Sequence, residues 1–153
     1  MHDLPKTAPP LRLPGYRGDF NFSCISDKEV NVIRVSPFRK SKKDELVIQF
    51  GYTLGRNGFD LGLQPGQQAI FIISASLSDK TKKPTVLFIQ GKTKTWERNS
   101  VIMDNTSWDQ YIVSKRIRAG ATDVCFGINW QPKTEKEWLE IKNARIFVIN
   151  QDG

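Results

Sequence analysis

Apolar and polar residues alternate along most of this chain with the period of two that is typical of half-buried β-strands. Phe20, Phe22 and Cys24 alternate with polar neighbours, and apolar or β-branched runs then recur at a spacing of roughly ten residues. The expected strands are Phe20–Cys24, Val30–Val35, Glu45–Tyr52, Gln68–Ser76, Thr85–Gly91, Arg98–Met103, Trp108–Ile117, Thr122–Trp130 and Trp138–Val148. The pattern therefore predicts an all-β protein.

Helix signals are nearly absent. Residues 133–143 are rich in Glu and Lys, but the apolar positions from Leu139 to Val148 fit two strand phases joined by a bulge near Asn143 and Ala144. Many short strands in one chain predict a β-sandwich jelly roll of about nine or ten strands.

The domain organisation follows from length and from the N-terminal composition. A chain of 153 residues suits one domain. Residues 1–17 are proline-rich and aperiodic, so we expect a leader or linker there and the β-sandwich domain over residues 18–150. Further along, Pro65 and Gly66 predict a tight turn, because proline fixes one corner and glycine tolerates positive φ.

Composition and the N-terminal sequence indicate where in the cell the protein is expected to be. Hydrophobic residues make up 39% of the chain, and no apolar run approaches the roughly 20 residues that span a bilayer, so no membrane association is expected. The first residues lack the charged start and apolar block of a secretory signal. We therefore expect an intracellular protein, although the localisation stays open until the parent architecture is known.

The residues needed for catalysis are scarce. The single histidine, His2, lies in the expected leader, which argues against histidine acid–base chemistry and histidine metal sites. Cys24 and Cys125 lie in apolar strand patterns, which favours buried free thiols. The carboxylates form no distinctive motif. We expect no enzyme, no catalytic residue, no metal-ligand set and no cofactor, while a structural calcium held by loop oxygens stays open.

Aromatic and amide side chains near strand ends favour a binding role. Sugars present flat C–H faces that stack on aromatic rings, and their hydroxyls need amide or similar hydrogen-bonding partners. We expect Trp96 and Trp130 to supply stacking, with Gln90, Asn129 and Tyr111 as hydrogen-bonding partners. By contrast, Trp108 opens a strand after a polar turn and is expected in the core, and one of Trp130 and Trp138 is expected to hold their shared loop.

A set of short motifs, in order, resembles the jelly-roll carbohydrate-binding modules appended to xylanases and cellulases. The motifs cover about 90 residues, a length within the range of one such sandwich. They are Leu63-Gln64-Pro65-Gly66-Gln67 before an apolar strand, Phe88-Ile89-Gln90, Trp96, Thr106-Ser107-Trp108, Val124–Ile128 and Ile141–Val148. The resemblance implies a galactose-binding-like β-sandwich that binds carbohydrate. The family's last strand often carries an acidic residue ahead of its apolar run, where this chain has Lys142 and Asn143.

These observations favour a non-catalytic module that binds poly- or oligosaccharide. Two alternatives stay open: a protein-interaction or assembly domain on the same fold, and a basic surface that binds acidic polysaccharide. The second follows from a net charge of +7 with basic residues gathered in expected turns. The expected partners are a carbohydrate, and a larger parent protein or another protein; nucleic acid is not expected.

Overall fold

The structure is a computed structural model that describes residues 2–3, 11–12, 20–27, 30–37, 46–50, 64–81 and 83–149. Its strands are β1 (His2–Asp3), β2 (Leu11–Arg12), β3 (Phe20–Asp27), β4 (Val30–Pro37), β5 (Leu46–Phe50), β6 (Gln68–Leu77), β7 (Val86–Lys92), β8 (Trp96–Ile102), β9 (Asp109–Arg116), β10 (Asp123–Trp130) and β11 (Leu139–Ile149). Within these residues the structure has no helix. The predicted all-β class is therefore confirmed.

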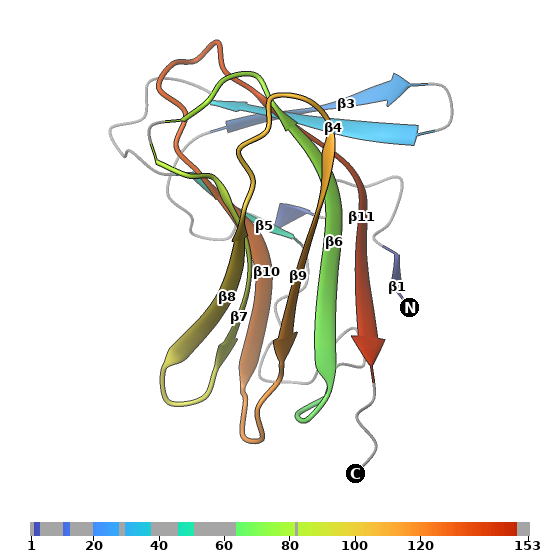
Figure 1. The fold of residues 1–153 in the computed structure, drawn as a ribbon, viewed down its shortest axis with the longest axis vertical. Helices are drawn as coiled ribbons and strands as arrows, with labels where there is room; N and C mark the ends of the chain where they lie inside the picture. Colours follow the sequence, from blue (N-terminus) through green and yellow to red (C-terminus); the bar gives the residue numbers. More distant parts are fainter. Residues whose placement is uncertain are drawn as a thin grey trace.

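Two antiparallel sheets form a sandwich (Figure 1). The six-stranded sheet has the order β3-β4-β11-β6-β9, with β1 paired to β11, and the five-stranded sheet has the order β2-β5-β10-β7-β8. Each of the nine strands expected from the sequence overlaps an observed strand from β3 to β11. The predicted β-sandwich jelly roll is thus confirmed, and β8 and β9 are edge strands of opposite sheets.

The core lies between the two sheets, on the alternate residues that face inward. Phe71 of β6 and Phe126 of β10 meet edge to face across it, with ring centroids 5.6 Å apart and planes at 88°. Leu87 and Ile89 of β7 and Trp130 of β10 belong to the same buried cluster. Residues between these positions on β7 and β10 therefore face outward from the five-stranded sheet.

Two irregular backbone positions match the sequence predictions. Gly66 has φ of 90°, and Gln67 donates its N–H to the carbonyl of Gln64 at 3.2 Å, so the tight turn at Pro65 and Gly66 forms. In β11 the register with β6 shifts between Lys142 and Arg145. Asn143 has φ of 53° at this shift, which confirms the predicted bulge.

The segment expected as a leader contains two short strands. β1 pairs with β11, and β2 pairs with β5 at the edge of the five-stranded sheet. The boundary expected between residues 17 and 18 lies outside the described residues, as does the side chain of Cys24. In the part of the chain that is described, no helix is long and apolar enough to cross a membrane.

Candidate functional site

The outward face of edge strand β8 presents a row of accessible side chains. Trp96, Arg98, Ser100 and Ile102 alternate with residues that face the other sheet, and all four are exposed. Trp96 is 47% exposed and Ile102 is 56% exposed. The row spans six residue steps, or about 20 Å along the strand. We call these four residues the β8 row.

The opposite face of β8 fastens the strand to β9. Glu97 forms ion pairs with Arg118 at 3.0 Å and with Lys115 at 3.8 Å. Asn99 donates its side-chain N–H to the carbonyl of Ser114 in β9 at 2.8 Å. Val101 packs against the core cluster. The β8 row is therefore carried by a strand that contacts both sheets.

At the centre of this face, Arg98 is held by Gln90 and Phe88 of the neighbouring strand β7. The Nε and one Nη of Arg98 donate to Oε1 of Gln90 at 3.1 and 2.9 Å. The guanidinium carbon lies 3.9 Å from the centroid of the Phe88 ring. Gln90 in turn donates its Nε2 to Sγ of Cys125 in β10 at 3.4 Å. Both ends of the Gln90 amide are thus engaged, and the guanidinium has a fixed position.

Cys125 and Asn129 of β10 lie on the same outward face, next to β7. Burial raises the pKa of the Cys125 thiol to about 11, while the Gln90 hydrogen bond and the Arg98 charge act in the opposite direction. Cys125 is buried, as predicted. Asn129, opposite Val86 of β7, has a buried Oδ1 with no hydrogen-bond partner among the residues that the structure describes. Buried side-chain acceptors are usually hydrogen-bonded, so this oxygen is an exception within the described residues.

Three of the five residues expected at the site share this face, and two do not. Gln90, Asn129 and Trp96 lie on the outward face of the five-stranded sheet. Trp130 is only 1% exposed and belongs to the core cluster, so its ring faces are covered by protein rather than open to a ligand. Tyr111 lies on β9 of the other sheet, and its hydroxyl accepts the N–H of Asn105 at 3.3 Å. Burial raises its pKa.

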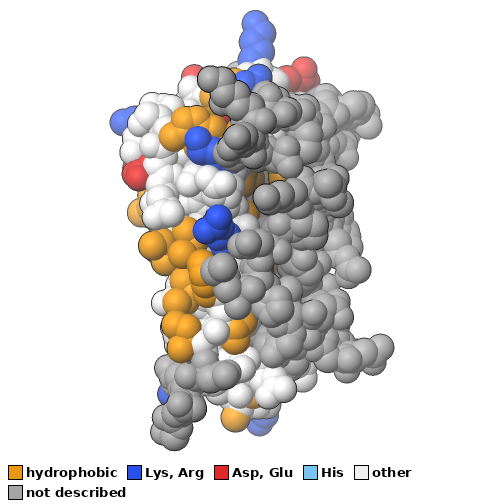
Figure 2. All heavy atoms as spheres, turned by 90° about the vertical axis from the view of Figure 1, so that its right-hand side faces the viewer, with side chains coloured by type: hydrophobic (Ala, Val, Ile, Leu, Met, Phe, Trp, Pro, Cys, Tyr) orange, Lys and Arg blue, Asp and Glu red, His pale blue; other side chains and the backbone are white. Residues whose placement is uncertain are grey.

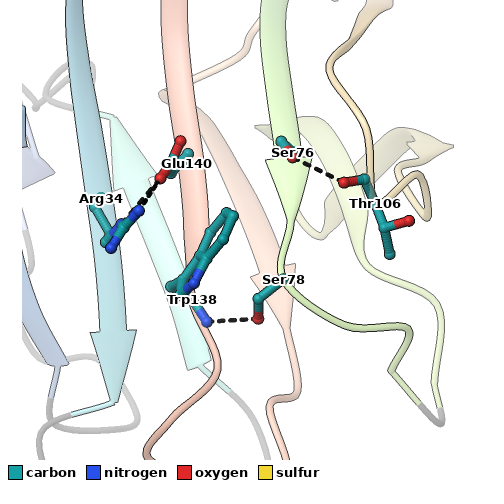
Figure 3. Close-up of polar contacts among 6 residues, drawn as sticks. All are labelled: Arg34, Ser76, Ser78, Thr106, Trp138 and Glu140. Carbon is teal, nitrogen blue, oxygen red and sulfur yellow. Dashed lines mark hydrogen bonds and ion pairs between the residues drawn. The ribbon is translucent and has the colours of Figure 1, made fainter. Parts of the chain in front are cut away.

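The remaining tryptophans lie on the six-stranded sheet. Trp108 is 39% exposed, so the prediction that it packs in the core is wrong. Its ring is covered on one side by the Lys142 ammonium, 4.1 Å from the centroid. Trp138 is half-buried before β11, with the Arg34 guanidinium carbon 4.6 Å from the ring centroid. Figure 3 shows its ring beside the ion pair that joins Arg34 of β4 to Glu140 of β11.

Hydrogen bonds around Trp138 tie its loop to neighbouring strands (Figure 3). The Trp138 N–H donates to Oγ of Ser78 at 2.8 Å, and the N–H of Ser78 donates back to the Trp138 carbonyl at 2.9 Å. Ser76 donates its hydroxyl to the carbonyl of Thr106 at 3.1 Å. Trp138 therefore helps to hold this end of the sheet, as the sequence suggested for one member of the pair with Trp130.

The outward face of the six-stranded sheet also carries an apolar strip. In Figure 2, hydrophobic side chains gather in a vertical band on this side of the molecule. Ile112 is 51% exposed and Ile149 is 49% exposed, and three half-buried apolar residues lie between them by register. The apolar strip consists of Ile70, Ile72, Ile112, Phe147 and Ile149.

Among the described residues, no group of three or more His, Cys, Asp or Glu side chains has the geometry to hold a metal ion. On the outward face of the five-stranded sheet, the titratable side chains that the structure describes are Lys92, Arg98, Asp123 and Cys125. Lys92, which is opposite Trp96, places its ammonium 5.8 Å from the Trp96 ring centroid. Asp123 is opposite Lys92, and its Oδ2 accepts the hydroxyl of Thr122 at 3.1 Å. The face is therefore suited to recognition through charge, hydrogen bonds and stacking.

Comparison with solved structures identifies the fold. A structure described as Family 16 Carbohydrate Binding Module-2 aligns with a TM-score of 0.60 at 12% identity, over 90% of this chain and 89% of that chain. The chain has the fold of a carbohydrate-binding module. A CBM4 structure aligns with a TM-score of 0.55 at 9% identity, over 85% of this chain and 78% of that chain.

A third carbohydrate-binding-module structure has the same fold. The C-terminal family 22 module of Clostridium thermocellum Xyn10B aligns with a TM-score of 0.53 at 13% identity, over 90% of this chain and 84% of that chain. No protein-family model matches the sequence, and no curated protein matches it. The carbohydrate-binding-module sandwich predicted from the short motifs is therefore confirmed at the level of the fold.

Arg98 is the residue of this face that the sequence reasoning missed. The sequence pattern predicts that this strand begins at Arg98, which leaves Trp96 outside it. β8 begins at Trp96, two residues earlier, so Arg98 is a strand residue opposite Gln90. The alternation of Trp96, Arg98, Ser100 and Ile102 with residues that face the other way is the signal that identifies the row.

Proposed function

We propose that this chain is a non-catalytic module that binds poly- or oligosaccharide along the β8 row. Trp96 stacks on a sugar ring, and Arg98 donates hydrogen bonds to the next part of the ligand. Asn129 lies on the same outward face, two strands away from β8. Gln90 acts mainly through Arg98, since its amide is already engaged at both ends. Trp130 and Tyr111 have no direct part in this proposal.

One observation carries the proposal: an exposed tryptophan and a fixed guanidinium lie two residues apart on the same face of a strand. Their Cα atoms are separated by about 7 Å along the strand. A flat apolar surface next to oriented donors is the combination that a sugar ring requires. The fold supports the proposal, because the three structures compared above are described as carbohydrate-binding modules.

Electrophoresis in gels that contain a soluble polysaccharide tests this site. Wild-type protein should be retarded by at least one polymer in a panel, and Trp96→Ala should migrate as it does in a gel without polymer. Trp108→Ala is the matched control, because it removes an exposed tryptophan from the other sheet. The proposed site is rejected when Trp96→Ala is retarded as strongly as wild type, or when Trp108→Ala alone loses retardation.

We also propose that the module works as part of a larger protein. The family 22 neighbour is described as one module of Clostridium thermocellum Xyn10B. The chain would then deliver its parent protein to a polysaccharide without reacting with it. A structural calcium is not required by this proposal. Thermal unfolding in calcium and in chelator would reveal one as a difference in the melting temperature.

The apolar strip favours a second function, that of a protein-interaction or assembly domain. Ile112 and Ile149 are each about half exposed, and contiguous apolar surface of this kind often marks a protein contact. Sedimentation velocity would then show a discrete complex that Ile112→Lys abolishes. Ile102→Lys, a similar change on the other sheet, would leave the complex intact. A monomer at all concentrations and no copurifying partner would reject this function.

A further inference from the structure

The guanidinium of Arg98 has a fixed position and no counter-ion among the described residues. Two of its N–H groups donate to the neutral amide oxygen of Gln90, and its flat face lies on the Phe88 ring. Glu97 pairs with Arg118 and Lys115, and Glu140 pairs with Arg34, so neither of these carboxylates pairs with Arg98. The positive charge of Arg98 is therefore held at an exposed position that no carboxylate of the described residues neutralises.

The support beneath Arg98 defines which way it faces. Arginine only donates hydrogen bonds, so the carbonyl oxygen of Gln90 must face it and the amide nitrogen must face away. That nitrogen donates a hydrogen bond to Sγ of Cys125 at 3.4 Å. Stacking on Phe88 and bonding to Gln90 leave the remaining N–H groups of the guanidinium directed away from these two contacts. Less conformational entropy is lost when such an oriented group binds a ligand.

A guanidinium prefers planar or tetrahedral oxyanions, with which it forms paired, charge-assisted hydrogen bonds. A second cation, Lys92, lies one cross-strand row away beside Trp96, and one carboxylate, Asp123, lies opposite Lys92. Among the side chains that the structure describes, this face thus has two cations and one anion, and the whole chain has a net charge of +7. A neutral sugar makes little use of this charge, whereas an acidic sugar next to the Trp96 ring would pair with it.

We propose that the ligand bound along the β8 row is an acidic glycan, whose anionic group forms a charge-assisted pair with Arg98 while a sugar ring stacks on Trp96. This inference rests on the proposed carbohydrate-binding function and specifies its ligand class. The anionic group is a carboxylate, as in a uronic acid, or a sulfate ester. Gln90 is a positioning residue, since it acts by holding Arg98.

Two matched polymer pairs test the ligand class. One pair is polygalacturonate and its fully methyl-esterified form, which have the same sugar chain but carry charged carboxylates and neutral methyl esters respectively. The other pair is dextran sulfate and dextran. Wild-type affinity, measured by gel retardation or calorimetry, should be at least about 10-fold higher for the charged member of one pair, since a hydrogen bond to a charged group contributes roughly 10- to 100-fold. Preference for the first pair identifies a carboxylate, and preference for the second identifies a sulfate.

Three variants test the role of Arg98. Arg98→Gln should lose about 10-fold or more of the affinity for the charged polymer, and the charge preference with it. Gln90→Glu, which is nearly isosteric, should lower this affinity similarly, because it provides an internal carboxylate for Arg98 while the protein stays folded. Arg116→Gln is the control, because it removes an exposed arginine from β9 of the other sheet, and its affinity should change by less than about 2-fold.

The outcomes separate this inference from the proposed function. Equal affinity for charged and neutral polymers, with Arg98→Gln unaffected, would overturn the acidic ligand while leaving carbohydrate binding intact. Equal losses in Arg98→Gln and Arg116→Gln would also overturn it, because the attraction would then be diffuse rather than located at Arg98. Failure to bind any polymer in a broad panel, charged or neutral, would overturn the proposed function itself.

Discussion

Arg98 of β8 covers the ring of Phe88 of β7, with its guanidinium carbon 3.9 Å from the ring centroid. Phe88 alternates with the core residues Leu87 and Ile89, so it faces outward, yet it is 0% exposed. The aliphatic stem and flat head of an arginine can shield an aromatic ring in this way and still present charge to solvent. One side chain therefore has a structural role and the recognition role proposed for it.

This contact predicts a modest stability loss when Arg98 is shortened. Arg98→Ala should lower the free energy of unfolding by about 1 kcal/mol, because it removes the cation–π contact and exposes the Phe88 ring. Arg116→Ala, on β9, should stay within about 0.5 kcal/mol of wild type. Urea denaturation followed by tryptophan fluorescence measures both changes. Equal values for the two variants would show that Arg98 does not stabilise Phe88.

Trp130 should contribute to stability rather than to ligand binding. It is 1% exposed in the core cluster, so Trp130→Ala removes a large buried side chain and should cost about 3–5 kcal/mol. Trp96→Ala, at an exposed position, should cost less than about 0.5 kcal/mol. Chemical denaturation of the two variants gives the comparison. A Trp130→Ala protein as stable as wild type would contradict the core placement.

The turn before β6 should require glycine. Gly66 has φ of 90°, and an alanine Cβ at this position would meet no described atom within 4 Å. Gly66→Ala therefore tests backbone strain alone and should cost about 1–2 kcal/mol. Gly91→Ala is the control, because a Cβ there would meet the nearest atom, Cε of Lys115, at an ordinary 3.6 Å. Its stability should stay within about 0.5 kcal/mol of wild type. Similar costs for both changes would contradict the turn geometry.

Burial of Cys125 predicts both a slow thiol reaction and a pH effect. Its pKa is raised from 9.0 to about 11, so at pH 8 the thiolate fraction is about 100-fold lower than in the unfolded chain. In a Cys24→Ser background, alkylation of native protein at pH 8 should be at least about 10-fold slower than alkylation in denaturant. Equal rates would contradict the burial of this thiol.

The same pKa shift has a consequence for stability. Because the folded-state pKa lies above the unfolded value, the contribution of Cys125 is fully present below pH 9 and is lost as the pH rises toward 11. The free energy of unfolding should therefore fall with pH in this window more steeply in wild type than in Cys125→Ala, by up to about 1.4 kcal/mol per pH unit. Parallel urea titrations at several pH values measure the difference, and identical slopes would refute it.

Strand alternation predicted the fold well because it depends only on which residues face the core. The turn at Pro65 and Gly66 and the bulge at Asn143 followed from backbone chemistry that is local in sequence. The exposure of the tryptophans was less predictable. They lie at or next to strand ends, where exposure depends on which other strands pack over that end. Trp130 shares a face with Val124, Phe126 and Ile128, and that alternation correctly indicates the core even though the residue ends its strand.

The site was partly predictable for the same reason. Gln90 and Asn129 were expected to contact a ligand, and both lie on one outward face, but the pairing of β7 with β8 that brings Arg98 onto Gln90 depends on where the hairpin turns. Beginning β8 at Trp96 rather than Arg98 shortens that turn and places Arg98 inside the strand, on the same face as Trp96. Trp108 was wrongly predicted to lie in the core. It was expected to be the first residue of its strand, but β9 begins one residue later, at Asp109.

The most direct test of a binding site on the β8 row is an NMR titration of the four tryptophan indole N–H signals with oligosaccharide, each signal assigned by a Trp→Phe variant. The account predicts that the Trp96 signal shifts progressively and saturates, while the buried Trp130 signal and the Trp108 and Trp138 signals on the other sheet stay within the line width. Shifts confined to Trp108 and Trp138, or no shift with any glycan, would contradict it.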